Sequence, residues 1–261
     1  MTNIIAILQA RISSSRLPGK VLMPLLGKPM LERQLERNHR SRNIDSLIVA
    51  TSTDPSDDPI AEFCREANVA VYRGSLDDVL DRYYQAASGA KADVVVRLTA
   101  DCPLADPGVL DQLVRFHLDG GYDYSSNTIE RTFPKGVDAE IFGFDVLQTA
   151  WNEARLPSHR EHVTPFMIEN PERFRLGSFK QTENLSDHRW TVDYPADFAF
   201  VEAVYESLYL QNSDFSSQEI FVLLKNKPDL AAINAHFDPE ETASKSRVQD
   251  AAFLAGRAGE F

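Results

Sequence analysis

The sequence predicts an α/β fold with a mostly parallel central sheet and helices on both faces. Short apolar runs rich in β-branched residues alternate with amphipathic stretches along the first half of the chain, and this alternation is typical of parallel sheets. The run Val94-Val95-Val96 is apolar without interruption. A strand with this composition is expected to be covered by helices on both of its faces.

The individual elements follow from the spacing of the apolar residues. We predict strands at residues 4–9, 46–51, 69–72 and 93–99. The stretches between and after them place apolar residues on one helical face, which predicts helices at residues 30–40, 58–67, 76–87 and 107–118.

From about residue 122 the pattern is less regular. We predict strands at residues 122–126, 140–144, 174–179 and 190–193 and helices at residues 145–155, 159–170, 195–210 and 216–225. Residues 122–188 are interpreted as a segment inserted into a domain of residues 1–237, where it forms a substrate lid or a subunit contact. Residues 238–261 are polar and poor in aromatic side chains, which predicts a loosely ordered tail.

Composition excludes several classes of function. The net charge of −12 argues against a nucleic-acid partner, which needs a basic face. Residues 1–40 nevertheless carry seven basic and two acidic side chains, which suggests a small anionic ligand near the start of the chain. Two cysteines give no disulfide framework, and no apolar run is long enough to span a membrane. We therefore expect a cytoplasmic protein without a membrane partner.

The most informative motif is the stretch from Gln9 to Lys20, which directly follows the first predicted strand. Ligands of open α/β sheets bind at the carboxyl ends of strands. Arg11 and Arg16 can fork onto phosphate oxygens, and Lys20 adds a compact charge. The motif lacks the glycines of the common phosphate-binding loops. The alternative interpretation is a solvated basic loop.

This stretch, Gln9-Ala10-Arg11-Ile12-Ser13-Ser14-Ser15-Arg16-Leu17-Pro18-Gly19-Lys20, resembles the signature loop of the CMP-sugar synthetases. These are the acylneuraminate and 3-deoxy-manno-octulosonate cytidylyltransferases, and the resemblance is closest to their spore-coat polysaccharide biosynthesis branch. It extends over about residues 3–205 and includes the segments 27–30, 49–52, 73–83, 97–103 and 189–193. The resemblance implies a glycosyltransferase-A-like nucleotidyltransferase fold, dependence on Mg²⁺ and transfer of CMP from CTP.

Two carboxylates are candidate metal ligands. Asp101 follows the strand predicted at 93–99, and Asp193 ends the strand predicted at 190–193. Either could instead be a turn or helix-capping residue, since both stand just before a proline-containing segment. The resemblance implies that both bind Mg²⁺, while Asp197 fits the first turn of the next helix.

The resemblance also implies a nucleotide-binding set, in which Arg73, Ser75 and Asp78 recognise the base. The full set is Leu8, Gln9, Ala10, Arg11, Ser15, Arg16, Lys20, Arg73, Ser75, Asp78 and Asp101. Ser75 could equally cap a helix. For the sugar we expect Asp138 and Glu140, which share one face of a strand, and Arg160, which could hold a carboxylate. Surface charges and a helix start are equally compatible with these three.

The predicted function is a Mg²⁺-dependent cytidylyltransferase with Arg11, Lys20 and Asp101 as catalytic groups. It would join CMP from CTP to the anomeric hydroxyl of a sugar, preferably an acidic one, for polysaccharide or glycan biosynthesis. Two alternatives stay open. One is a glycosyltransferase of the same fold, although such enzymes usually carry Asp-x-Asp where this chain has Asp101-Cys102-Pro103. The other is a non-catalytic nucleotide-binding protein. The resemblance also implies a homodimer.

Overall fold

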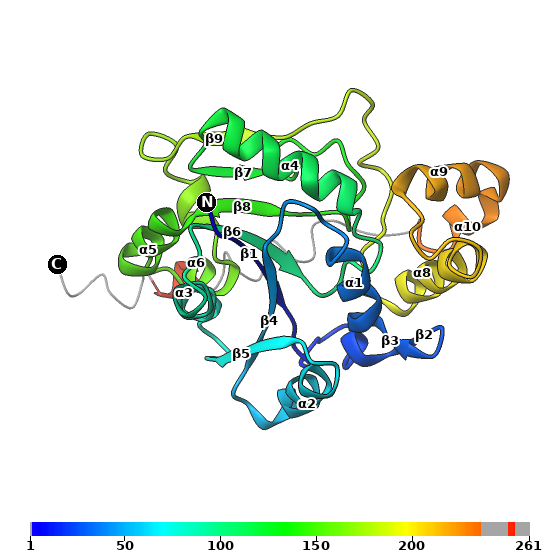
Figure 1. Ribbon diagram of the computed structural model, residues 1–261, viewed down its shortest axis with the longest axis horizontal. Coiled ribbons are helices and arrows are strands. Elements are labelled where there is room, and N and C mark those ends of the chain that lie inside the picture. Colours follow the sequence, from blue (N-terminus) through cyan, green and yellow to red (C-terminus); the bar gives the residue numbers. More distant parts are fainter. Residues whose placement is uncertain (1, 236–249, 254–261) are drawn as a thin grey trace.

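A seven-stranded sheet forms the centre of the protein (Figure 1). The structure, a computed structural model, describes residues 2–235 and 250–253. Across the sheet the strands follow the order β5-β4-β1-β6-β8-β7-β9. Their bounds are Ile4–Gln9 (β1), Ser46–Ser52 (β4), Ala70–Gly74 (β5), Val94–Thr99 (β6), Tyr124–Ser126 (β7), Glu140–Gly143 (β8) and Leu176–Ser178 (β9). Two further short strands, Pro24–Leu25 (β2) and Lys28–Pro29 (β3), form a separate antiparallel pair.

Most of the strand pairs are parallel, which confirms the predicted fold class. β1 pairs in parallel with both β4 and β6, and β4 pairs in parallel with β5. β8 is antiparallel to β6 and to β7, whereas β7 and β9 are parallel. The carboxyl ends of β1, β4, β5 and β6 therefore lie along one edge of the sheet. This is the edge at which open α/β sheets bind their ligands.

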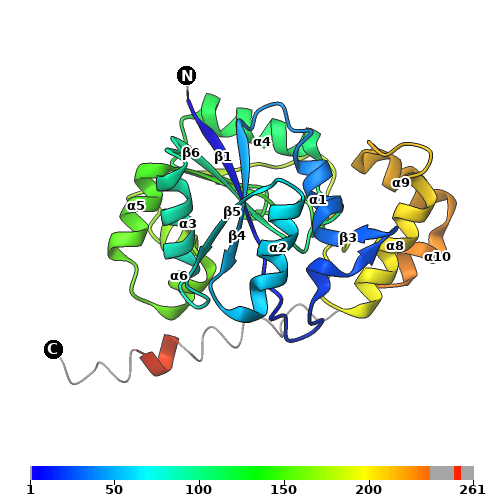
Figure 2. The same cartoon turned by 60° about the horizontal axis from the view of Figure 1, so that its bottom comes forward.

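Helices cover both faces of the sheet, as the sequence predicts (Figures 1 and 2). One face packs against Met30–Asn38 (α1), Asp58–Glu66 (α2) and Pro107–Gly120 (α4). The other packs against Val79–Gly89 (α3), Phe144–Glu153 (α5) and the short helix Pro165–Ile168 (α7). A neighbouring short helix, Pro157–His162 (α6), contacts α3 and α7.

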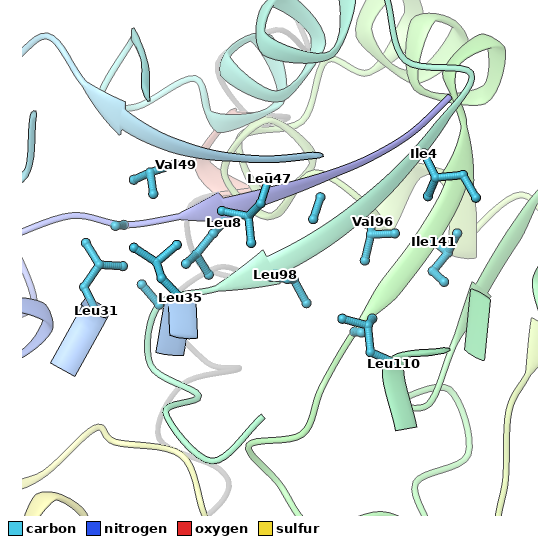
Figure 3. Packing of buried hydrophobic residues seen from close by; sticks show 14 of the residues in the cluster. Ile4, Leu8, Leu31, Leu35, Leu47, Val49, Val96, Leu98, Leu110 and Ile141 are labelled. Atoms are coloured by element: carbon cyan, nitrogen blue, oxygen red, sulfur yellow. The ribbon is translucent and has the colours of Figure 1, made fainter. Parts of the chain in front are cut away.

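The side-chain alternation of β1 divides the core between these two faces. Ile4, Ala6 and Leu8 belong to the cluster on the α1 face, and Ile5 and Ile7 belong to the cluster on the α3 face. Figure 3 shows the first cluster, in which side chains of β1, β4 and β6 meet those of α1 and α4. Each fully buried aliphatic side chain of this kind contributes about 1.5–3 kcal/mol of transfer free energy. Strand β1 is therefore fixed in register, and the loop that follows it starts from a rigid support.

A third apolar cluster lies beside the sheet. It joins Trp190 to Pro195–Leu208 (α8) and Ser217–Asn226 (α9), and Pro228–Ala232 (α10) completes this group (Figure 1). Trp190 and Val192 are fully buried in it. This burial holds the segment before α8 in place next to the carboxyl end of β6.

The strand predicted at residues 190–193 is wrong. Residues 190–193 are not part of any strand, and the isolated bridge nearby joins Lys135 to Arg189, one residue before them. Its apolar residues are buried against α8 and α9 rather than against sheet neighbours. The apolar run therefore predicts correctly that the segment is buried, but the buried segment is a loop and not a strand.

Two predicted helices also differ from the structure. The helix predicted at 159–170 is interrupted, because Val163 has φ of 73° and the chain restarts at Pro165 as α7. The helix predicted at 76–87 begins later, at Val79, because the Asp78 side chain accepts a hydrogen bond from the amide of Asp81 and caps the helix there. The pair β2–β3 and helix α10 were not predicted.

Within the described ranges no helix combines the length and apolar character that crossing a bilayer requires. The polar tail predicted at residues 238–261 lies outside the described residues except for 250–253. In that short stretch, the Asp250 carboxylate accepts a hydrogen bond from the amide of Ser158 at 3.0 Å.

Candidate active site

The basic loop after β1 is folded back on itself and tied to the sheet. The amide of Gly19 donates to the carbonyl of Ile12 at 3.0 Å, and the amide of Ile12 donates to the Asp57 carboxylate at 2.7 Å. Asp57 is fully buried and also accepts from the amide and hydroxyl of Ser52 at the end of β4. Gly19 adopts φ of 72°, a conformation that glycine reaches without strain. Asp57 was not singled out in the sequence, because its partners become visible only in the fold.

Lys20 is the point at which distant segments meet. Its Nζ donates to the carbonyl of Val192 at 2.6 Å and to Asp193 Oδ1 at 3.1 Å, and it lies 3.5 Å from Asp101 Oδ2. The residue is only 8% exposed. A buried ammonium is stable only when it is paired, so Lys20 and the two carboxylates hold one another in position.

Asp193 is the most strongly stabilised carboxylate of the site. Arg16 Nη2 lies 2.8 Å from its Oδ1, and Arg189 Nη2 lies 3.1 Å from its Oδ2. Burial raises the pKa of Asp193, but the charges of Lys20 and Arg16 outweigh that effect and hold the pKa well below its ordinary value. Asp193 is therefore ionised at neutral pH.

Asp197 supports this arrangement from the first turn of α8. Its carboxylate accepts from Nε and Nη2 of Arg189 at 2.7 and 2.8 Å. It also accepts from the backbone amides of Asp193 and Tyr194, each at 2.9 Å. Asp197 thus has the predicted role at the start of the helix and a second role, which is to orient Arg189.

Backbone contacts bring Asp101 and Asp193 together. The carbonyl of Asp101 accepts from the amide of Val192 at 2.8 Å and from the hydroxyl of Thr191 at 3.1 Å. Gly136 permits this approach, since a Cβ there would lie 2.4 Å from backbone atoms of Trp190 and Thr191. The carboxylate of Asp101 is itself oriented by the hydroxyl of Thr99 at 2.6 Å.

The two carboxylates fit a divalent metal ion. Both converge on one cation, the ammonium of Lys20. Mg²⁺ is usually bound by one or two carboxylates together with substrate phosphates and water, so a pair of aspartates is a sufficient protein contribution. The described residues contain no group of three or more His, Cys, Asp or Glu side chains that could hold a metal by themselves. The donor set thus matches an ion that arrives with a phosphate ligand.

Arg11 lies away from this cluster, in a cavity of about 730 Å³. The same cavity is lined by Ser75, Asp78 and Arg160. Arg160 Nη2 lies 2.5 Å from Asp78 Oδ2, so one residue expected to bind the sugar is paired with one expected to bind the base. The basic residues of the predicted phosphate-binding loop therefore lie in two places. Arg16 and Lys20 contact the aspartates at positions 101 and 193, whereas Arg11 lines a cavity with the segment between β5 and α3.

The other predicted nucleotide residues vary in accessibility. Leu8 and Ala10 are buried in the core, and the side-chain oxygen of Gln9 is buried without a hydrogen-bond partner among the described residues. Ser15 is exposed. Arg73 donates to the carbonyl of Ser52 at 2.8 Å and pairs with Asp58 at 2.7 Å, both next to the carboxyl end of β4.

A second cavity, of about 710 Å³, opens beside Arg189, which contacts Asp193. Arg131, Lys135, His188 and Arg189 line it together with Trp190. Burial, and after it the charge of Arg189, lowers the pKa of Lys135. The cavity thus combines a basic rim with an aromatic wall, a combination that suits an anionic ligand with an apolar or sugar-ring face. Arg131 was absent from the predicted set, because no sequence pattern marks it.

The predicted sugar residues Asp138 and Glu140 both have partners within the protein. Asp138 accepts from both terminal nitrogens of Arg131, at 2.5 and 2.9 Å, and so orients a residue of this cavity. Glu140 is paired with Arg97 and accepts from the hydroxyls of Tyr124 and Thr164, each at 2.6 Å. Glu140 therefore has its hydrogen-bonding capacity used within the protein. Asp138 does not line the cavity itself but contacts Arg131, which does.

Comparisons with known proteins identify the family and the fold of the chain. The family model described as Cytidylyltransferase matches residues 5–222. The chain is similar to the spore coat polysaccharide biosynthesis protein SpsF of Bacillus subtilis, with 33% identity over 88% of this chain and 98% of the relative. It is also similar to the 3-deoxy-manno-octulosonate cytidylyltransferase of Geobacter sulfurreducens, with 37% identity over 43% of this chain and 44% of that protein. The solved structure of a cytidylyltransferase from Leptospira borgpetersenii superposes with a TM-score of 0.85 and 32% identity, covering 91% of this chain and all of the other.

Proposed function

This chain belongs to the cytidylyltransferase family and is a nucleotidyltransferase, and we propose that it transfers CMP from CTP to the anomeric hydroxyl of an acidic sugar. The observation that carries the proposal is the contact of Lys20 with both Asp101 and Asp193, flanked by Arg16. A polyphosphate needs cationic groups along its oxygens and a carboxylate pair that shares a metal ion with it. This cluster supplies both within one small region.

In the proposed reaction the hydroxyl oxygen of the sugar attacks the α-phosphorus of CTP. The bond from the α-phosphorus to the bridging oxygen breaks, and pyrophosphate leaves with that electron pair. The proton of the sugar hydroxyl passes to solvent water. Arg16 and Lys20 neutralise the charge that develops on the leaving pyrophosphate, and Arg11 holds the nucleotide from the other side. Because such a transfer depends on positioning and charge stabilisation, fixed cationic groups are its main requirement.

Asp101 and Asp193 are the proposed ligands of Mg²⁺. A bound Mg²⁺ ion would supply additional positive charge to the phosphate oxygens. The protein's own contribution is to orient both carboxylates. Thr99 orients Asp101, and Arg16, Lys20 and Arg189 surround Asp193.

The two cavities suggest where the substrates lie. The cavity with Arg11, Ser75 and Asp78 is the proposed site of the nucleoside half, in agreement with the base-binding role expected from the sequence. The cavity with Lys135 and Arg131 is the proposed sugar site, because its wall includes Arg189, which contacts Asp193. Its basic rim favours an acidic sugar over a neutral one.

A homodimer that uses residues 122–188 and a cytoplasmic location are further parts of the proposal. The dimer rests on the family resemblance, and the location rests on the composition of the sequence. Sedimentation velocity of the purified protein tests the dimer directly.

Pyrophosphate release is the decisive assay. The protein is mixed with CTP, Mg²⁺ and one sugar at a time, with 3-deoxy-manno-octulosonate and N-acetylneuraminate as acidic sugars and mannose and N-acetylglucosamine as neutral ones. We expect pyrophosphate and a CMP-sugar with an acidic sugar and CTP, and little with UTP, ATP or GTP. Turnover of a supplied nucleotide sugar, without any use of CTP, would identify the glycosyltransferase alternative instead. Absence of CTP binding by calorimetry, with and without Mg²⁺, would contradict the nucleotidyltransferase proposal.

A further inference from the structure

Arg82, on α3, is a fully buried arginine without a hydrogen-bond partner. Its exposed fraction is 0%, and Nε, Nη1 and Nη2 all lack a partner among the described residues. Buried arginines are normally paired, because burying an uncompensated charge is costly. Such an unpaired group requires an explanation.

A second buried arginine, Arg37, shows how the protein satisfies a buried guanidinium by hydrogen bonds. Arg37 is 2% exposed, and its Nε and Nη2 donate to the carbonyls of Ala105 and Phe215 at 2.6 and 2.9 Å. Its guanidinium also lies over the Phe215 ring, 4.3 Å from the ring centre. Arg37 therefore has the contacts of a structural residue, and Arg82 does not.

The surroundings of Arg82 point to the nucleotide cavity. Arg82 lies one helical turn after Asp78, whose carbonyl accepts from its amide at 3.2 Å. A Cβ on Gly74 would lie 3.4 Å from Cβ and Cγ of Arg82, so the arginine stem runs along the end of β5. Asp78 lines the cavity of about 730 Å³, and so do Arg11 and Ser75.

Both positive and negative charges act on Arg82. Burial lowers the pKa of Arg82, and the positive charge of Arg11 lowers it further, while Asp57 and Asp78 raise it. Asp57 and Asp78 are committed to other contacts, with Ile12 and Ser52 and with Arg160. Among the described residues no hydrogen bond or ion pair engages Arg11. Arg11 lines this cavity, and its positive charge acts on the buried guanidinium of Arg82, which likewise has no partner among the described residues.

We propose that Arg82 is a further phosphate-binding residue, which together with Arg11 takes up a phosphate group of the nucleotide. The inference rests on the proposed function and adds a residue to its nucleotide site. A phosphate would supply the negative charge that the pair lacks, and a guanidinium fork matches its oxygens. Because Arg82 is fully buried, the side chains that cover it must move for direct contact. The protein then carries an unfavourable buried charge that nucleotide binding relieves.

The variant Arg82→Met separates this role from a structural one. Methionine has a similar length and no charge, so it fills the site without an unpaired group. We expect the melting temperature of Arg82→Met without ligand to equal or exceed that of the wild type. We also expect the thermal shift of the wild type with inorganic pyrophosphate and with CTP, both in Mg²⁺ buffer, to be largely lost. The Kd for CTP should rise about tenfold or more.

Arg37→Met is the matched control. It removes a buried arginine that is hydrogen-bonded, so it should lower the melting temperature and leave the pyrophosphate shift intact. Arg82→Lys should keep part of the shift, because it retains the charge and loses the fork.

Three results would overturn the inference. One is an Arg82→Met protein that is destabilised but keeps its full response to pyrophosphate and CTP, which would make Arg82 structural. The second is a variant with unchanged melting temperature and unchanged ligand response. The third is loss of the response to cytidine, used as a phosphate-free probe, with the pyrophosphate response retained, which would assign Arg82 to the base. If the wild type itself responds to neither pyrophosphate nor CTP, the proposed function fails before the role of Arg82 is reached.

Discussion

The Nζ of Lys20 lies 3.1 Å from Oδ1 of Asp193, although 173 residues separate the two in the chain. Lys20 ends the loop after β1, and Asp193 precedes α8. The contact joins the start and the end of the sheet domain around one ion pair.

Lys20→Ala is expected to reduce turnover with little change in fold. Removing one preorganised charged donor from a phosphate-transfer site costs about 3 kcal/mol of barrier, which corresponds to about a hundredfold in kcat. Steady-state pyrophosphate release measures the change, and far-ultraviolet circular dichroism checks the fold. The control is Lys28→Ala, because Lys28 is half exposed and, within the described part of the chain, pairs with Glu32 and Glu36 on the surface. Equal turnover in both variants would remove Lys20 from the mechanism.

Asp193→Asn and Asp197→Asn should differ in their dependence on Mg²⁺. Asp193 is a proposed metal ligand, so its amide variant should need more Mg²⁺ and lose about a hundredfold or more in kcat/KM. Asp197 accepts four hydrogen bonds from Arg189 and the backbone of Asp193 and Tyr194. Its amide variant should lose stability, by about 3 kcal/mol, because a buried ion pair is broken. Urea unfolding and Mg²⁺ titration of activity measure the two effects. A Mg²⁺ dependence shifted equally in both variants would contradict the assignment.

Lys135→Met should weaken sugar binding selectively. Lys135 lines the cavity of about 710 Å³ next to Arg189. Loss of a charge-assisted contact with a sugar carboxylate should raise the KM for an acidic sugar about tenfold to a hundredfold. The KM for CTP should stay unchanged. Lys180→Met is the control, since Lys180 is an exposed residue paired with Glu130. A rise in the KM for CTP alone would place the nucleotide, rather than the sugar, in this cavity.

His117 should make the protein less stable in mild acid. Burial lowers the pKa of His117 to about 4, and the opposing effect of Asp123 is smaller. The unfolded chain, with an ordinary pKa near 6.5, binds the proton first as the pH falls. Stability is therefore fully present above about pH 6.5 and is lost as the pH falls toward 4. Between pH 7 and 5 the loss from this group is about 2 kcal/mol.

The measurement for His117 is the free energy of unfolding in urea at pH 7 and at pH 5. His117→Gln keeps a side chain that can contact the Ser125 hydroxyl, which lies 3.0 Å from Nδ1. This variant should lose about 2 kcal/mol less than the wild type over the same interval. Parallel pH dependences of the two proteins would show that His117 is not the responsible group.

Much of the fold could be predicted from local patterns. Strand β1 has the predicted bounds, and β4, β5 and β6 lie within two residues of theirs. Their apolar runs are covered by helices on both faces, so burial and sequence pattern agree. The prediction was wrong at residues 190–193, where equally apolar residues are buried in the third cluster. An apolar run records that a segment is buried, but it does not record which neighbour buries it.

The candidate site could be predicted only in part for the same reason. The sequence identified Lys20, Asp101 and Asp193 as separate candidates, and the structure brings them into contact. It did not identify Arg131, Asp57 or the unpaired state of Arg82. These properties depend on pairing partners far along the chain, such as Asp138 for Arg131 and Ile12 for Asp57.

The sequence by itself determined the class of the protein: a parallel α/β sheet whose first strand ends in a basic loop, because strand periodicity and loop chemistry are local properties. Only the tertiary structure decided how the charges of that loop are shared. In the structure Arg16 and Lys20 pair with Asp193. Arg11 instead lines a cavity with Asp78, and its charge acts on Arg82. The physical reason is that a buried charge is stable only with a counter-charge within a few ångströms. The fold decides which segments lie close enough to supply that counter-charge. The hydrogen bond from the amide of Val192 to the carbonyl of Asp101, for example, holds the segment that carries Asp193 beside the end of β6.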